Sequence, residues 1–230
     1  MNILIIGSSG GIGSELALSL IETSNLLLGQ HKSDVNFPAK IYDVDSTNFD
    51  SVTDFVNKGL ELFNSIDAII SLPGSIILKP AHKCTDEDFY HAIDINLKSA
   101  FSVVRAAGDL LTNSSIVLMS TAAVSIGLAN HELIVSAKAG VEGLVRSAAK
   151  TYARKNLRFN TVSPGMVETP LTNNILKNDI VRKASQKMHV LNRIGKPRDV
   201  SNMINFLINP ENDWITGQNF IVDGGLSSTK

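Results

Sequence analysis

Short apolar runs alternate with longer amphipathic stretches along almost the whole chain. The runs predict strands at residues 3–6, 26–28, 40–43, 68–71, 115–119, 158–162 and 219–222. The stretches with apolar residues every three or four positions predict helices at 13–22, 49–63, 86–111, 133–155, 171–188 and 199–207. Because helices follow the strands as crossovers, we expect a mostly parallel sheet with helices on both faces, a doubly wound α/β fold.

Composition narrows the class of partner. The 230 residues are 43% apolar and 19% charged, which indicates a packed core rather than a disordered chain. Lysine and arginine (21) nearly balance aspartate and glutamate (22), so no net field favours nucleic acid or an anionic membrane. Without repeats or linkers, we expect one domain spanning 1–230 that acts on a small molecule.

Cysteine content and hydropathy indicate the compartment. Cys84 is the single cysteine, so it has no internal disulfide partner, and no Cys/His cluster offers metal ligands. No segment reaches the roughly twenty apolar residues of a membrane span, and the first apolar run is too short for a signal peptide. These features predict a cytoplasmic protein without metal or membrane anchor.

A glycine cluster lies between the first predicted strand and the first predicted helix. Gly7, Gly11 and Gly13 belong to the run GSSGGIG at 7–13. Glycine permits positive φ and close backbone approach, and the free N–H groups at a helix start attract a phosphate. The cluster fits a dinucleotide-binding turn, although a plain tight turn would also need glycine.

The spacing G-x-x-x-G-x-G resembles that of the short-chain dehydrogenase/reductase family, and further matches run from Ile3 to Leu226. They are DV at 43–44, DINL at 94–97, SPGMVET at 163–169, GKPRD at 195–199, ITGQ at 215–218 and VDGG at 222–225. The resemblance implies a Rossmann-like oxidoreductase, a homodimer or homotetramer, with a substrate loop at about 166–192. The family's N-N-A-G reads Ser71-Leu72-Pro73-Gly74 here, so its strand-bridging asparagine is absent.

The resemblance also implies a set of cofactor-binding residues. They are Gly7, Ser9, Gly11, Ile12 and Gly13 at the phosphates, Asp43 and Val44 at the adenine, Lys138 at the nicotinamide ribose, and Pro164, Gly165, Val167 and Thr169 at the nicotinamide. After the second predicted strand, His31 and Lys32 stand where an NAD site would use an acidic residue. They favour NADP(H) over NAD(H) by pairing with a 2′-phosphate, unless both are plain loop residues.

The catalytic motif departs from the family pattern. The family uses Y-x-x-x-K with a serine thirteen positions before the tyrosine. Aligning SAKAG at 136–140 places the lysine at Lys138, the tyrosine position at Ile134 and the serine position at Thr121. Asn96 matches the helix asparagine whose backbone helps to hold a water near the lysine. Isoleucine cannot donate a proton, and losing a general acid lowers the rate by roughly 10²–10⁴.

Two groups are candidates for the missing acid, since Tyr42 and Tyr90 lie in other segments and Tyr152 lies about four helical turns beyond Lys138. His131 precedes Ile134 by three positions and can titrate near neutral pH. Lys138 could act through the ribose hydroxyl and water. Equally, His131 could be an exposed or substrate-binding histidine, Lys138 a cofactor ligand only and Thr121 a structural residue.

Three functions therefore stay open. The favoured one is an NADP(H)-dependent oxidoreductase of a carbonyl or alcohol with an atypical or impaired proton relay, because the glycines, Lys138 and Asn96 are retained. The alternatives are a catalytically degenerate dinucleotide-binding regulatory protein and a non-redox lyase or isomerase on the same fold. No motif identifies the substrate.

Overall fold

Seven parallel strands form one sheet in the computed structural model, which describes residues 1–31 and 35–229. The strands are β1 (Asn2–Ile6), β2 (Asn25–Gln30), β3 (Lys40–Asp43), β4 (Ala68–Ser71), β5 (Ser115–Met119), β6 (Arg158–Pro164) and β7 (Asn219–Val222). β4 and β5 are buried along their whole length, which is why their sequences are mainly apolar rather than alternating, with Ser71 and Ser115 as the exceptions at the strand ends.

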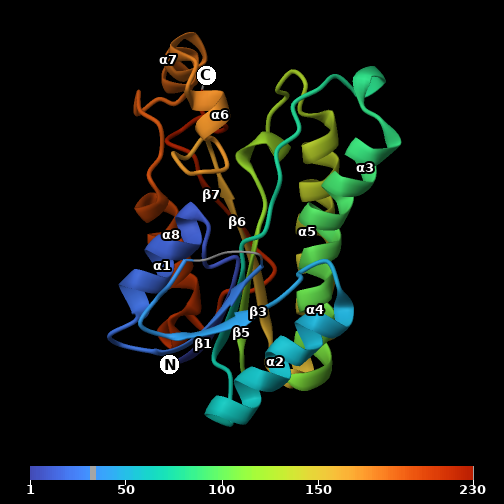
Figure 1. Ribbon diagram of the computed structural model, residues 1–230, viewed down its shortest axis with the longest axis vertical. Coiled ribbons are helices and arrows are strands. Elements are labelled where there is room, and N and C mark those ends of the chain that lie inside the picture. The colour runs from blue at the N-terminus through green and yellow to red at the C-terminus, as the bar shows by residue number, and fades with distance from the viewer. Residues whose placement is uncertain (32–34, 230) are drawn as a thin grey trace.

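Helices cover both faces of the sheet (Figure 1). They are α1 (Gly11–Leu20), α2 (Phe49–Phe63), α3 (Asp86–Ile93), α4 (Ser99–Leu110), α5 (Glu132–Thr151), α6 (Asn173–Leu176), α7 (Asp179–Met188) and α8 (Pro197–Ile208). α2, α4 and α5 pack on one face around Phe55 and Phe159, and α1 and α8 pack on the other around Leu16 and Ile204. The predicted doubly wound fold is confirmed.

The strand order predicts a ligand-binding crevice at the carboxyl ends of the central strands. The order is β3-β2-β1-β4-β5-β6-β7, so the winding reverses between β1 and β4. Ile3 pairs with Leu26 of β2 on one side and Ala68 of β4 on the other. In an open parallel sheet, ligands bind outside the carboxyl ends of the strands at such a switch point. Here that position is where β1 runs into the glycine turn.

Two predicted helices differ from the observed ones. The predicted helix at 86–111 consists of α3 and α4 joined by a π-helical turn, Asp94–Lys98, and π-turns often occur at functional sites. The predicted helix at 171–188 is divided into α6 and α7, because the Asn178 side chain accepts from the Ile180 and Val181 N–H groups and starts a new helix. Within the described ranges, no helix is long and apolar enough to cross a bilayer.

The glycine turn joins β1 to α1 with little room to spare. Gly7 has a φ of 82°, in the left-handed region. A Cβ at Gly13 would collide with the carbonyl oxygen of Gly7. The N-cap residue of α1 is Gly10, which has no side chain that could cap the helix. The helix therefore packs close against the strand end, with its first-turn N–H groups uncapped by a side chain.

We predict that Gly13→Ala destabilises the protein by about 1–3 kcal/mol, because the added methyl group overpacks the turn. The measurement is urea unfolding followed by circular dichroism. Gly127→Ala is the matched control, since a Cβ at Gly127 would meet nothing within 4 Å. Equal stability of the two variants would show that α1 is not held against Gly7.

Candidate active site

Two adjoining cavities lie at the carboxyl ends of the central strands. One has a volume of about 370 Å³ and is lined by the whole glycine turn; we call it the glycine-turn cavity. The other has a volume of about 330 Å³ and lies under α6 and α7; we call it the apolar cavity. Thr121 and Ile134 line both cavities, so the two volumes meet at these side chains.

The glycine-turn cavity combines a helix start with a narrow backbone cradle. Gly7, Ser9 and Gly10–Gly13 form one wall, and residues 72–76 after β4 form another. A Cβ at Gly11 would lie 2.9 Å from Thr169 Cβ, so the 166–192 segment packs directly over the turn. Uncapped N–H groups facing a concave site suit an anion such as a pyrophosphate. The residues present therefore fit a dinucleotide.

Lys138 is the buried cation of this cavity. It lies on α5 with 6% of its surface exposed, and its Nζ donates to the carbonyl oxygen of Met119 over 3.0 Å. Burial lowers the pKa of Lys138 from 10.5 to about 8, because the charged amine loses most of its solvation. An ammonium near its pKa at mild pH can both hold a hydroxyl group and exchange a proton.

Asn96 holds the π-helical turn against the loop after β4. Its Oδ1 accepts from Ser75 N–H over 3.1 Å, and its Nδ2 donates to Ser75 Oγ over 3.0 Å and to Ala92 O over 2.9 Å. A Cβ on Gly74 would lie 3.3 Å from Asn96 Oδ1 and 3.8 Å from Lys138 Nζ. Glycine at this position therefore keeps space open between the amide and the amine.

Thr121 and Ile134 form the boundary between the cavities. Thr121 follows the end of β5, and its Oγ1 accepts from Ala123 N–H over 3.3 Å, which leaves the hydroxyl proton available to a ligand. Ile134 is 7% exposed and presents only hydrocarbon. All three tyrosines lie within the described residues, and none lines either cavity.

His131 lies at the wall of the apolar cavity with Thr121 and Ile134. It is the residue before α5, is partly exposed, and its Nδ1 lies 2.8 Å from Ala129 O. Because a carbonyl oxygen only accepts, Nδ1 carries the hydrogen, and Nε2 is the nitrogen left for a ligand. The structure thus brings His131 to the same cavity as Thr121.

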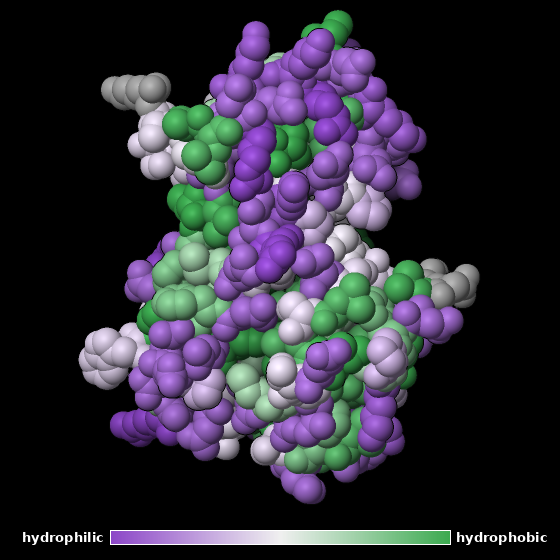
Figure 2. All heavy atoms as spheres, turned by 90° about the vertical axis from the view of Figure 1, so that its left-hand side faces the viewer, coloured by the Kyte–Doolittle hydropathy of each residue, from purple (hydrophilic) through white to green (hydrophobic). Residues whose placement is uncertain are grey.

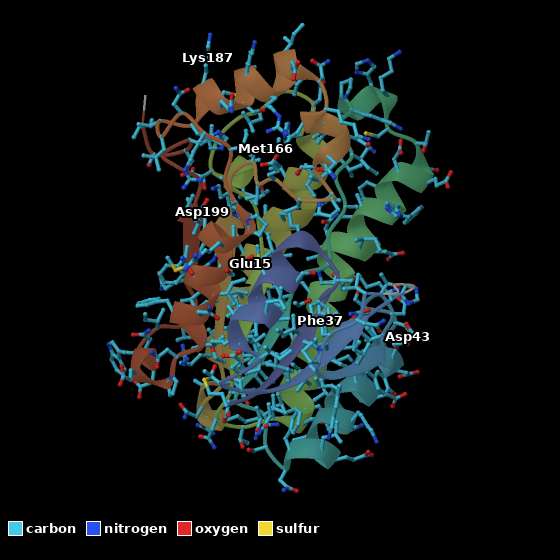
Figure 3. All side chains as sticks on the ribbon, turned by 60° about the vertical axis from the view of Figure 1, so that its left-hand side comes forward. Glu15, Phe37, Asp43, Met166, Lys187 and Asp199 are labelled. Atoms are coloured by element: carbon cyan, nitrogen blue, oxygen red, sulfur yellow. The ribbon has the colours of Figure 1, made fainter. Side chains whose placement is uncertain are left out.

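The residues predicted at the adenosine end lie apart from these cavities. His31 and Asp43 stand at the ends of neighbouring strands β2 and β3, with Nδ1 and Oδ1 3.3 Å apart. Val44 is 2% exposed and belongs to the core, so its side chain does not face solvent. Lys32 lies outside the described residues. Figure 3 shows Asp43 well separated from Met166, which lies beside the apolar cavity.

The other predicted site residues, apart from His131, line one cavity. The glycine-turn cavity is lined by Gly7, Ser9, Gly11, Ile12, Gly13, Asn96, Thr121, Lys138, Pro164, Gly165, Val167 and Thr169. Among the residues the structure describes, no cluster of three His, Cys, Asp or Glu side chains could hold a metal ion.

His189 is a buried residue that the sequence reasoning missed. It follows α7 and is 4% exposed; its Nδ1 donates to Ser185 O over 2.6 Å, and its Nε2 accepts from Met166 N–H over 3.2 Å. The ring therefore ties the end of α7 to the backbone beside Gly165. In the sequence it is one more histidine in a polar stretch, and no pattern separates it from a surface residue.

Comparison with known proteins identifies the family. A family model described as "Enoyl-(Acyl carrier protein) reductase" matches residues 13–227. The chain belongs to the short-chain dehydrogenase/reductase family. Members of this family are oxidoreductases that bind a nicotinamide dinucleotide.

Relatives within this family match nearly the full chain. The 3-oxoacyl-(acyl-carrier-protein) reductase FabG of Thermotoga maritima is 29% identical, over 97% of this chain and 96% of its own. The ligand-free aldohexose dehydrogenase of Thermoplasma acidophilum is 26% identical, with a TM-score of 0.91 over 100% of this chain and 95% of its own. The structure titled "ElxO with NADP Bound" is 25% identical, with a TM-score of 0.89 over 99% of both chains.

The buried amine of Lys138 predicts a pH-dependent stability. Between about pH 8 and pH 10.5 the folded protein has released this proton and the unfolded chain has not, so a rise in pH favours the folded state. Relative to Lys138→Met, the wild-type protein gains up to roughly 3 kcal/mol of unfolding free energy across this range. Below about pH 8 the difference between the two proteins stays constant.

Urea unfolding at pH 7, 8, 9 and 10, carried out at about 25 °C, measures this difference in unfolding free energy. Lys150→Met is the matched control, because Lys150 is an exposed lysine on the same helix. A difference between wild type and Lys138→Met that does not change with pH would mean that the amine is solvated.

Proposed function

We propose that this chain is an NADP(H)-dependent oxidoreductase that interconverts a carbonyl compound and an alcohol, with a proton route that does not use tyrosine. The observation that carries the proposal is that the glycine turn, Lys138 and Thr121 line one cavity. That cavity adjoins a second one, beside His131, with room for a substrate. The two cavities together thus have room for a dinucleotide and a substrate, and Lys138 lines the first of them.

The dinucleotide would be held along the glycine-turn cavity. The N–H groups of Gly11, Ile12 and Gly13 would bind its phosphates, with Gly7 and Ser9 completing the turn. Lys138 would bind the nicotinamide ribose, with Asn96 supporting the water beside it. When bound, the nicotinamide supplies or accepts a hydride. Residues Pro164, Gly165, Val167 and Thr169 would enclose the ring and exclude water from it.

The preference for NADP(H) rests on His31, the residue after β2, and on Lys32, the next residue in the sequence. A protonated imidazole and an ammonium pair with a 2′-phosphate, whereas an NAD site uses a carboxylate at this position. The relative described with NADP bound supports this choice. Asp43, 3.3 Å from His31 Nδ1, would orient that ring and accept from the adenine amino group, while Val44 acts through its backbone.

The proton would come from His131 in the reduction direction. Hydride transfer leaves an alkoxide, and Ile134 at the position that we assign to the tyrosine has no proton to give. The Thr121 hydroxyl donates to this oxygen, and Nε2 of protonated His131 supplies the proton, while Nδ1–H stays bound to Ala129 O. The second candidate donor is Lys138, whose pKa of about 8 allows proton exchange near neutral pH.

A dinucleotide-binding regulatory protein is the second candidate function. Its support is the hydrocarbon of Ile134, 7% exposed, at the boundary where a proton donor would be needed. In that case the cavities bind ligands without turnover. The family resemblance supports a cytoplasmic homodimer or homotetramer. Its interface would be built on α3, α4 and α5, where Phe101 of α4 is 47% exposed.

Turnover measured at the nicotinamide absorbance band, with NADPH and NADH in parallel, tests the proposed proton donor. His131→Ala should lower kcat by roughly 10²-fold or more with NADPH affinity unchanged, because only the acid is removed. His82→Ala is the matched control, since His82 lies on a short exposed turn away from both cavities. Undiminished turnover in His131→Ala would exclude His131 and leave Lys138 as the donor.

Ile134→Tyr separates an oxidoreductase from a regulatory protein. A phenol placed beside Thr121 and Lys138 should raise kcat by roughly tenfold or more. A positioned acid contributes roughly 10²–10⁴ in rate, and the wild-type donor already supplies part of this factor. Ile134→Phe, which has the ring without the hydroxyl, should not raise it. If no ketone is reduced by the wild type or by Ile134→Tyr although NADPH binds, the regulatory function is supported instead.

A further inference from the structure

The apolar cavity is lined mainly by hydrocarbon from four parts of the chain. The contributing side chains are Ile76 and Leu78 after β4, Leu128 and Ile134 around the start of α5, Met166, Ile175 and Met188 from the 166–192 segment, and Leu226 near the carboxyl terminus. Figure 1 shows the last part of the chain close to α6 and α7, at the end of the molecule where the cavity lies. Such a lining recognises shape and apolar surface rather than a pattern of hydroxyl groups.

Most polar groups of the cavity are already used within the protein. Both ring nitrogens of His189 are hydrogen-bonded, to Ser185 O and to Met166 N–H. Thr172 Oγ1 donates to Val167 O over 2.6 Å. Among the described lining residues there is no carboxylate and no side-chain amide. These groups therefore leave little capacity to bind several substrate hydroxyls.

Two side chains with polar atoms left for a ligand lie where the two cavities meet, and the Ser185 hydroxyl on α7 is a further polar group of the lining. Thr121 has a hydroxyl proton to donate, and His131 has its Nε2 atom. Both residues line the cavity together with Ile134. A substrate that places one oxygen there would leave the rest of its surface against hydrocarbon.

We propose that the substrate is a mainly hydrocarbon ketone or secondary alcohol with one hydrogen-bonding oxygen, and not a polyhydroxylated sugar. The proposal rests on the oxidoreductase function proposed above and specifies its substrate class. Each hydroxyl buried without a partner lowers affinity by about tenfold, whereas each buried methylene group raises it. The cavity therefore separates this chain from its relative named as an aldohexose dehydrogenase, despite a TM-score of 0.91.

Exposed apolar side chains at the cavity are consistent with an apolar ligand. Leu78 is 36% exposed and Met188 is 46% exposed, and both line the cavity. Figure 2 shows a mostly hydrophilic surface at the end of the molecule that carries α7, with scattered hydrophobic side chains. A hydrocarbon ligand would cover these two side chains and remove their apolar surface from water.

The test compares two ketones that differ in one substituent, 4-tert-butylcyclohexanone and 4-hydroxycyclohexanone. We expect kcat/KM with NADPH to be about tenfold or more higher for the tert-butyl compound, because its substituent is buried against hydrocarbon. Binding of the two corresponding alcohols to the protein with NADP⁺, measured by calorimetry, should show the same order. The calorimetric arm does not depend on turnover.

Two variants place the effect in this cavity. Ile175→Asn puts an amide among the lining residues and should weaken binding of 4-tert-butylcyclohexanol by about tenfold. Ile180→Asn is the matched control, because Ile180 is 80% exposed on α7 and lines neither cavity. Its binding should equal that of the wild type.

The outcomes distinguish the substrate class from the function. Tighter binding of the tert-butyl alcohol without reduction of either ketone would support the apolar site and contradict the oxidoreductase function. Three results would overturn the proposal. The hydroxy alcohol could bind as tightly as the tert-butyl alcohol or more tightly, D-glucose could be turned over at a lower KM than the tert-butyl compound, or neither alcohol could bind detectably. An equal effect of Ile175→Asn and Ile180→Asn would also overturn it.

Discussion

The close approach of α1 to the end of β1 is the constraint on which the rest of the site depends. A Cβ at Gly13 would collide with Gly7 O, so the helix can start against the strand only because that atom is missing. This contact fixes the first-turn N–H groups of α1 at the switch point of the sheet. The 166–192 segment rests on the same turn through Gly11 and Thr169, so the roof of the glycine-turn cavity is positioned by it too.

The chemistry of the site depends on the buried amine of Lys138 and on the neighbouring hydrocarbon side chain of Ile134. The amine of Lys138, on α5, donates a hydrogen bond to Met119 O at the end of β5. Because the buried ammonium loses solvation, the pKa of Lys138 is lowered to about 8. A fold does not need such a residue for packing, so its presence indicates a ligand. Ile134, one turn earlier on the same helix, gives the site an apolar surface beside this amine.

Much of this architecture was predictable from sequence, and the rest was not, for physical reasons. The strands at 68–71 and 115–119 were predicted at their observed bounds, because buried parallel strands are mainly apolar. The grouping of Gly7, Asn96, Thr121 and Lys138 in one cavity was implied by the family resemblance of their motifs. The role of His189 could not be predicted, since its two hydrogen bonds depend on how the 166–192 segment folds back. The separation of His31 and Asp43 from the cavities likewise depends on tertiary packing, whereas the break at Asn178 comes from the local N-cap hydrogen bonds of that side chain.

The central claim is that the glycine turn and Lys138 form a working dinucleotide site beside Ile134. Titration of the wild-type protein with NADPH, followed by the blue shift and enhancement of nicotinamide fluorescence, tests it most directly. The account predicts saturable binding with one site per chain, and weaker binding of NADH. No saturable signal from NADPH or NADH at about millimolar concentration, which corresponds to an affinity below roughly 4 kcal/mol, would contradict it.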